Sequence, residues 1–188
     1  MASWADESER DAAVDTPADG DTAPDLLTFH IVEPTSDEAL EAMRAYFSEL
    51  DARFVGGFDP GDSLTVGVHS MREPNGGTFV VAHVGHRLAA CGGVQRHDDH
   101  TGEIKRMWVN PDCRGIGLGR RMLAELETHV ARLGYTSIVL DTNDVLTEAI
   151  ALYTRSGYRE IEAYNDNPFA RHWFTKTITS EESSIGER

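Results

Sequence analysis

The stretch NPDCRGIGLGRRML, residues 110–123, places three glycines within five positions, directly before a run with helical spacing. Gly115, Gly117 and Gly119 carry no Cβ, so the backbone N–H groups beside them can approach a ligand closely. The N-terminus of a helix has unsatisfied N–H groups and the positive end of the helix dipole, so this junction favours an anion such as phosphate. For this stretch alone, a glycine-rich turn without a ligand stays open.

Three known phosphate-binding patterns can be compared with this loop. A Walker-type loop requires a lysine and a hydroxyl residue after its last glycine, and Gly119 is followed by arginine instead. The dinucleotide fingerprint G-x-G-x-x-G fails because Arg120 stands where its third glycine belongs. The pattern [Q/R]-x-x-G-x-[G/A] fits residues 114–119.

The segments around the loop alternate between strand and helix patterns. Two β-rich runs flank a Gly-X pair that suits a tight hairpin turn, and the Gly- and Pro-rich stretch 52–77 indicates loops or short helical turns. The expected order is a strand at 28–34, a helix at 35–50 with Thr35 as its N-cap, a hairpin at 77–96 turning at 84–87, a strand at 103–109, a helix at 118–133, a strand at 137–142, a helix at 147–156, and strands at 158–161 and 172–178. This order predicts one mixed sheet.

Composition sets the domain boundaries. The chain has 188 residues and a formal net charge of -15. Residues 1–27 are acidic and poor in large apolar side chains, so we expect a disordered tail there. We expect a second flexible tail at 180–188 and a single domain at 28–179.

Charge and hydropathy exclude several classes of partner. An acidic domain repels phosphate backbones, so a nucleic-acid partner is not expected. No apolar run reaches the roughly 20 residues of a membrane span, and the N-terminus does not resemble a secretory signal. The two cysteines suggest no disulfide framework. The sequence therefore predicts a cytoplasmic protein.

Residues 103–158 resemble the GNAT superfamily of CoA-dependent N-acyltransferases. The segment GEIKRMWVNPDCRGIGLGRRML is similar to its strand-four-to-helix-three signature, and AIALYTRSGYREI to its helix-four signature. The resemblance implies an α+β (mixed α/β) fold with a mostly antiparallel, twisted sheet of about seven strands, flanked by about four helices and splayed between strands four and five. It also implies acetyl-CoA as the acyl donor.

The resemblance assigns a cofactor site to backbone groups along strand four and to the glycine loop. The Met107 amide would hold the thioester oxygen, the loop would cradle the CoA pyrophosphate, and Asn143 would contact the pantetheine or act as a turn former. The implied cofactor-binding residues are Met107, Trp108, Val109, Arg114, Gly115, Ile116, Gly117, Leu118, Gly119, Arg120 and Asn143.

Two side chains match the family's catalytic positions. Tyr153 would act as the general acid toward the departing thiolate, although a core tyrosine has the same helical spacing. Glu103 would act as the general base through water; alternatively it is a surface strand residue paired with Lys105.

We therefore predict an acetyl-CoA-dependent N-acetyltransferase that acts on a primary amine of a small molecule by direct attack in a ternary complex. A non-catalytic acyl-CoA sensor and an acetyltransferase for protein amines stay as alternatives. The cluster at residues 97–100, His-Asp-Asp-His, has no third ligand set nearby, so no metal is expected. The sequence does not decide whether the protein forms a homodimer.

Overall fold

The structure is a computed structural model that describes residues 26–61 and 67–178. Apart from residues 26 and 27, the two predicted tails lie outside the described residues. No helix in the described ranges has both the length and the apolar character needed to cross a membrane.

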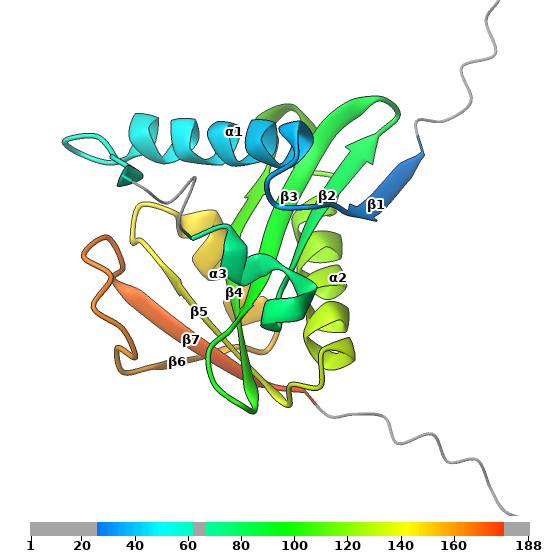
Figure 1. Cartoon of the computed structure of the whole chain (residues 1–188). Helices are drawn as coiled ribbons and strands as arrows, with labels where there is room; N and C mark the ends of the chain where they lie inside the picture. Colours follow the sequence, from blue (N-terminus) through cyan, green and yellow to red (C-terminus); the bar gives the residue numbers. More distant parts are fainter. Residues whose placement is uncertain (1–25, 62–66, 179–188) are drawn as a thin grey trace, which may run out of the picture.

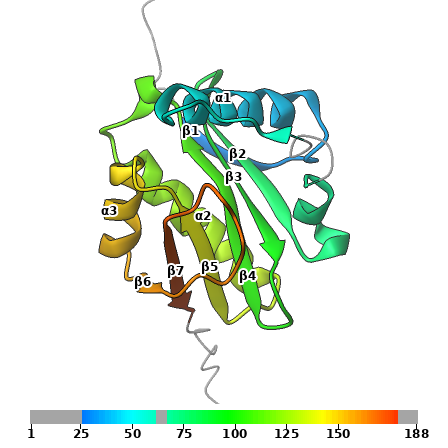
Figure 2. The ribbon, with the colours of Figure 1, turned by 90° about the vertical axis from the view of Figure 1, so that its left-hand side faces the viewer.

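The described residues form a seven-stranded sheet in the order β1-β2-β3-β4-β5-β7-β6 (Figures 1 and 2). Only the β4–β5 pair is parallel, and the remaining neighbours are antiparallel. The strands are β1 (Leu27–Ile31), β2 (Thr78–Val84), β3 (Arg87–Arg96), β4 (Thr101–Val109), β5 (Ser137–Thr142), β6 (Arg159–Ile161) and β7 (His172–Thr177). The predicted mixed, mostly antiparallel sheet is confirmed.

Three α-helices occur in the described ranges, one fewer than expected: α1 (Asp37–Arg53), α2 (Leu118–Arg132) and α3 (Thr147–Arg155). In place of a further helix after α1, the described part of 52–77 contains two single turns of 3₁₀-helix, η2 (His69–Met71) and η3 (Glu73–Asn75). Gly76 adopts a left-handed conformation at φ 74° and ends η3, which stops a longer helix from forming. A third such turn, η4 (Pro111–Cys113), follows β4.

The start of α1 differs from the prediction by one residue. Ser36, rather than Thr35, is the N-cap, because its Oγ accepts the Ala39 N–H at 3.2 Å. Apolar residues recur at helical spacing along α1, and Met43, Phe47 and Leu50 are buried.

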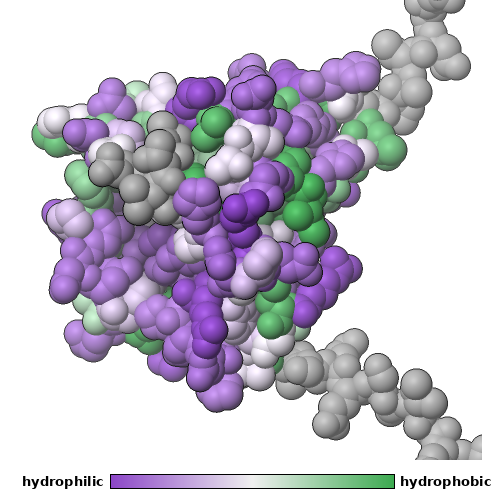
Figure 3. All heavy atoms as spheres, in the orientation of Figure 1, coloured by the Kyte–Doolittle hydropathy of each residue, from purple (hydrophilic) through white to green (hydrophobic). Residues whose placement is uncertain are grey.

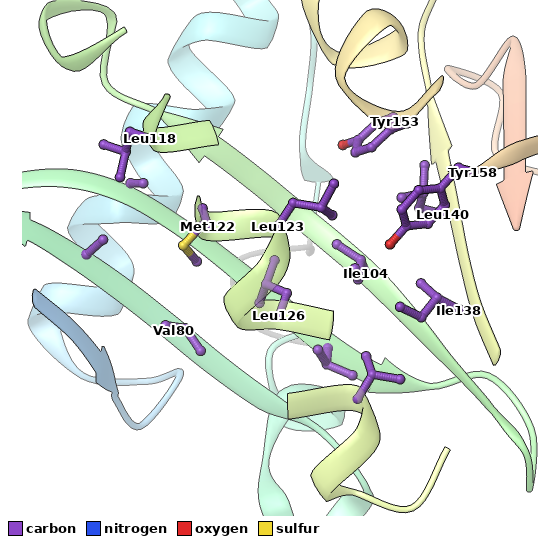
Figure 4. Close-up of a cluster of buried hydrophobic side chains, with 14 of the residues drawn as sticks. Val80, Ile104, Leu118, Met122, Leu123, Leu126, Ile138, Leu140, Tyr153 and Tyr158 are labelled. Carbon is purple, nitrogen blue, oxygen red and sulfur yellow. The ribbon is translucent and has the colours of Figure 1, made fainter. Parts of the chain in front are cut away.

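Helices cover both faces of the sheet. One core lies between the sheet and α2 and α3 (Figure 4), and a second core lies under α1. On the face shown in Figure 3 the surface is largely hydrophilic and the hydrophobic groups are small and separate. The large apolar side chains therefore serve mainly to fix the helices against the sheet.

The feature that shapes the site is the separation of β4 from β5. The two strands pair only where Thr101–Glu103 faces Ser137–Val139. Beyond Glu103, β4 bends at a register shift against β3, and Arg106 takes the left-handed value φ 55° within this bend. The predicted splay between these strands is confirmed, and it leaves one edge of β4 without a strand partner.

Candidate active site

The open edge of β4 presents backbone groups to the gap. The Asn110 N–H, directly after β4, donates to the Ala89 carbonyl of β3 at 2.8 Å. Because successive residues of a strand direct their N–H groups to opposite sides, the amide of Val109 points away from β3 and into the gap. Met107 lies two positions earlier, next to the bend at Arg106. Met107 thus lies on the open edge of β4 and lines the gap, and its role as the oxyanion donor stays a prediction.

A first cavity of about 300 Å³ runs along this edge between α1, α2 and α3. Most of the predicted cofactor-binding residues line it, whereas Ile116, Arg120 and Asn143 do not. Those that do are Met107, Trp108, Val109, Arg114, Gly115, Gly117, Leu118 and Gly119. Tertiary structure thus brings the β4 edge and the glycine loop into one site.

The glycine loop has the backbone of an anion cradle. Gly115 and Gly117 lie at φ 82° and φ 81°, a region that favours glycine. Gly117 is the N-cap of α2, so the amides of Leu118, Gly119 and the next residue have no partner within the helix. These residues fit the pyrophosphate of CoA.

Arg114 makes contacts that its motif did not predict. Its guanidinium donates to the Val109 carbonyl through Nε at 3.0 Å and Nη2 at 2.8 Å, and to Glu49 at 2.5 Å. Glu49 of α1 also accepts the indole N–H of Trp108 at 2.8 Å. Glu49 therefore ties α1 to β4 and to the glycine loop, although no sequence motif marks it.

A second ion pair joins the walls of the first cavity. Arg53 of α1 donates to Glu148 of α3 at 2.9 Å and to the Val145 carbonyl at 2.7 Å. The hydrogen bond from Arg53 lowers the pKa of the Glu148 carboxyl to about 2. Arg155 also lines this cavity. The sequence did not indicate Arg53 and Glu148, because long-range pairs leave no local pattern, and no motif marks Arg155.

A second cavity of about 410 Å³ lies on the other side of the gap. It is lined by α1, β4, the end of β5 and the β6–β7 loop. The two cavities share Tyr46, Leu50, Met107, Leu146, Ala149 and Tyr153. A ligand along β4 and a ligand in the second cavity would therefore meet at Met107 and Tyr153.

Tyr153 stands at this junction, and only 6% of its surface is exposed. Among the described residues its hydroxyl has no hydrogen-bond partner, whereas its ring packs beside Tyr158 at 5.8 Å between centroids (Figure 4). Burial and then the charge of Asp141 raise the pKa of the Tyr153 phenol above its ordinary value. The phenol is thus protonated at neutral pH and can donate a hydrogen bond.

Tyr46 faces the same junction from α1. Burial, followed by the nearby Tyr153 and Asp141, raises the pKa of its phenol. Sequence reading did not select Tyr46. The only available signal was a tyrosine three positions after Met43, at the border of the buried stripe.

Glu103 occupies a different environment from the expected one. It is 5% exposed, and it accepts hydrogen bonds from Gln95 at 2.6 Å, Lys105 at 3.0 Å and Tyr164 at 2.8 Å. The pair with Lys105 exists, but it is buried rather than on the surface. Glu103 lines neither of the two cavities.

Asp141 and Lys105 carry this polar network into the second cavity. Lys105 Nζ donates to Asp141 at 3.1 Å. Although burial opposes it, the carboxylates of Glu103 and Asp141 raise the pKa of the Lys105 ammonium. The amides of Asn165 and Asn167 donate to Asp141 at 2.7 and 3.2 Å. The β6–β7 loop therefore positions a carboxylate at the cavity.

Asn143 makes the contacts of a turn former. Its Oδ1 accepts the Val145 N–H at 3.0 Å and its amide donates to the Phe169 carbonyl at 2.5 Å. It lines the second cavity rather than the first. No group of three potential metal ligands occurs in the described ranges.

Residues 36–158 match the model of the Acetyltransferase (GNAT) family, which covers more than half of the chain. The chain belongs to this family of acyltransferases. The match includes β4, the glycine loop and α3, which build the first cavity.

Two relatives show the range of similarity. The chain is 30% identical over 122 residues to a protein named IAA acetyltransferase of Azospirillum brasilense, covering 64% of this chain and 78% of the relative. It is 42% identical over 66 residues to an uncharacterized N-acetyltransferase of Schizosaccharomyces pombe, covering 35% of this chain and 40% of the relative. The chain thus spans less than half of the yeast protein's length.

Solved structures agree on the fold. A GNAT acetyltransferase of Staphylococcus aureus covers 81% of this chain and 100% of its own, with a TM-score of 0.68 and 18% identity. A putative acyl-CoA N-acyltransferase of Klebsiella pneumoniae has a TM-score of 0.65 and 23% identity, and the match covers 82% of this chain and 99% of its own. A GNAT acetyltransferase of Elizabethkingia anophelis with acetyl-CoA bound has a TM-score of 0.57 and 16% identity, and the match covers 81% of this chain and 97% of its own.

Proposed function

We propose that the protein transfers an acetyl group from acetyl-CoA to a primary amine of a small molecule, by direct attack while both substrates are bound. The observation that carries this proposal is the junction of two cavities at the open edge of β4, where Met107 and Tyr153 line both. The relationship to a protein named IAA acetyltransferase supports a small acceptor. The cytoplasmic location and a homodimer stay predictions from the sequence.

The first cavity would hold acetyl-CoA, which supplies the acetyl group as a thioester. The glycine loop and the N-terminus of α2 would bind its pyrophosphate. Arg53 and Arg114 pair with glutamates in the same cavity, and Arg155 leaves its lining with one positive charge in excess. To leave the Val109 carbonyl for the pantetheine amide, the Arg114 side chain would move away from it.

Met107 and Tyr153 would stabilise the charges that develop during attack. The Met107 N–H donates to the thioester oxygen as it becomes an oxyanion. Tyr153 donates to the departing sulfur. An ordinary thiol has a pKa of about 8.5, and the pKa of Tyr153 is raised above that of an ordinary phenol. Tyr153 therefore contributes mainly a hydrogen bond to the thiolate.

Asp141 is the carboxylate best placed to receive the acceptor's ammonium. It lines the second cavity together with Met107 and Tyr153, whereas Glu103 reaches that cavity only through Lys105. We therefore propose that Asp141 takes the proton that the ammonium loses before attack, and that Glu103 positions Lys105 beside it. The role of Glu103 as the direct base stays a prediction from the family resemblance.

The test measures thiol release from acetyl-CoA against a panel of amines, together with acetyl-CoA binding by calorimetry. We expect turnover with at least one small amine, and a loss of about 10²- to 10⁴-fold in kcat for Asp141→Asn. If Glu103→Gln loses as much while Asp141→Asn keeps full activity, the base is assigned wrongly. Tight acetyl-CoA binding without turnover on any amine would favour the sensor, and turnover on peptide amines alone would favour a protein acceptor.

A further inference from the structure

An aromatic wall, made of Phe47, Phe54, Phe58 and Phe169, forms one end of the second cavity. Phe47 and Phe58 stack at 5.7 Å between centroids with an interplanar angle of 11°. Phe58 lies 4.7 Å from Phe169 and 5.5 Å from Phe54. These rings come from α1 and the segment directly after it, and from the β6–β7 loop, so two separate parts of the chain converge here.

The aromatic wall is open to the cavity rather than closed within a core. Phe169 is 36% exposed, and Phe54 and Phe58 are partly exposed. Apolar surface that lines a cavity of about 410 Å³ gains contact when an apolar group enters. Aromatic rings prefer offset or edge-to-face neighbours at about 4.5–7 Å, which is the spacing already present within the wall.

Charged groups line another part of the same cavity, where Lys105 and Asp141 lie, and Glu103 pairs with Lys105 from outside the cavity. These two carboxylates and one ammonium give the cluster one net negative charge. Asp141 accepts three hydrogen bonds from side chains. A carboxylate has about four acceptor positions, which leaves Asp141 able to accept one from an incoming ammonium.

We infer that the acceptor is a primary amine joined by a short linker to an aromatic ring. This rests on the proposed function and narrows its substrate. The ammonium pairs with Asp141 beside Met107 and Tyr153, and the ring packs on the aromatic wall. An amino sugar would place hydroxyl groups against phenylalanines, and these groups would lose hydration without gaining hydrogen bonds. A polyamine would place its methylene chain on the same wall, with Asp59 as the carboxylate that lines the cavity beside Phe58.

Arg106 bears on whether the acceptor also carries a carboxylate. It lines the second cavity, and its guanidinium lies 5.7 Å above the Phe47 ring. A carboxylate on the acceptor would lie near this cation. In both aromatic alkylamines and aromatic amino acids, the aromatic wall would bind the ring and Asp141 would bind the ammonium. The assay therefore includes one compound of each kind.

The experiment compares kcat/KM for 2-phenylethylamine, L-phenylalanine, n-butylamine, spermidine and glucosamine in the thiol-release assay. We expect at least one of the two aromatic amines to exceed n-butylamine by tenfold or more. If 2-phenylethylamine is the better of the two, the acceptor has no carboxylate. If n-butylamine, spermidine or glucosamine equals or exceeds both aromatic amines, the inference is wrong while the acetyltransferase function stands.

Matched variants locate the effect. Phe169→Ala should lower kcat/KM for the aromatic amine at least tenfold, while kcat/KM for n-butylamine and the Kd of acetyl-CoA stay unchanged. For Phe169→Leu, kcat/KM for the aromatic amine should lie between the values of Phe169→Ala and wild type. Val55→Ala is the control, because Val55 is fully exposed beside Phe54 and lies outside the cavity. Equal losses for aromatic and aliphatic amines would overturn the role of the wall. Failure to bind acetyl-CoA at all would instead overturn the proposed function.

Discussion

Replacing Tyr153 by phenylalanine tests the catalytic junction with the smallest change in structure. The substitution removes one hydroxyl, which has no hydrogen-bond partner among the described residues, and keeps the ring that packs against Tyr158 and Phe174. The free energy of unfolding should therefore stay within about 0.5 kcal/mol of wild type.

The expected kinetic loss follows from the raised pKa of Tyr153. General acid catalysis contributes about 10²- to 10⁴-fold. Because the phenol holds its proton tightly, it offers a hydrogen bond more than a full proton transfer, so we expect the lower end, about 10²-fold or about 2.7 kcal/mol. An interaction made only in the transition state lowers kcat and kcat/KM together, and KM for acetyl-CoA should stay unchanged.

The assay is thiol release at saturating acetyl-CoA, with urea denaturation of the same preparations. Tyr158→Phe is the matched control. Burial and then the Glu127 carboxylate raise the pKa of the Tyr158 hydroxyl, and Tyr158 lines neither cavity. Its removal should leave kcat unchanged and alter the free energy of unfolding by about 1 kcal/mol or less. Wild-type kcat in a folded Tyr153→Phe enzyme, or equal kinetic losses in both variants, would refute the reasoning.

Four further outcomes follow from the same geometry. Because Tyr153 stays protonated beyond its ordinary pKa, kcat/KM between pH 6 and about pH 10 should show no alkaline decline from this group; a decline that Tyr153→Phe abolishes would contradict this. Gly117→Ala, at φ 81°, should cost about 1–2 kcal/mol of stability and weaken acetyl-CoA binding at least about tenfold by calorimetry, so normal affinity in a folded variant would show that the loop does not hold the pyrophosphate. Gly93→Ala would place its Cβ 2.2 Å from Met71 Sδ, and the resulting overpacking should cost about 1–3 kcal/mol in urea denaturation without changing the Kd of acetyl-CoA. Both cysteines are buried and burial raises the pKa of Cys91 to about 12, so native protein should react with a disulfide reagent only on unfolding, when two thiols per chain appear; rapid reaction of the native protein would show that a thiol is accessible.

Local signals in the sequence were sufficient for much of the fold. The strand at 137–142 has the predicted bounds, and the hairpin turns at Gly85 as expected. Gly134 and Gly157 follow the last turns of α2 and α3 with positive φ, as helix-ending glycines do. Each of these features is decided by residues within a few positions of one another.

The prediction was less complete where the chain folds back on itself. The residue predicted as the base, Glu103, lies in a buried network, because the β6–β7 loop covers it with Tyr164. Asp141 falls within the strand predicted at 137–142, and its place in the second cavity depends on the gap that opens between β4 and β5.

The sequence by itself determined the glycine loop, the strand and helix that flank it and, through its resemblance to a family, the kind of cofactor. Only the tertiary structure decided which carboxylate faces the acceptor, how Glu49 restrains Arg114, and where four phenylalanines meet. The physical reason is one of range. Periodicity and turn residues report the local conformation and the buried face, whereas the contact between Arg114 and Glu49 spans 65 positions and exists only once α1 has packed across β4.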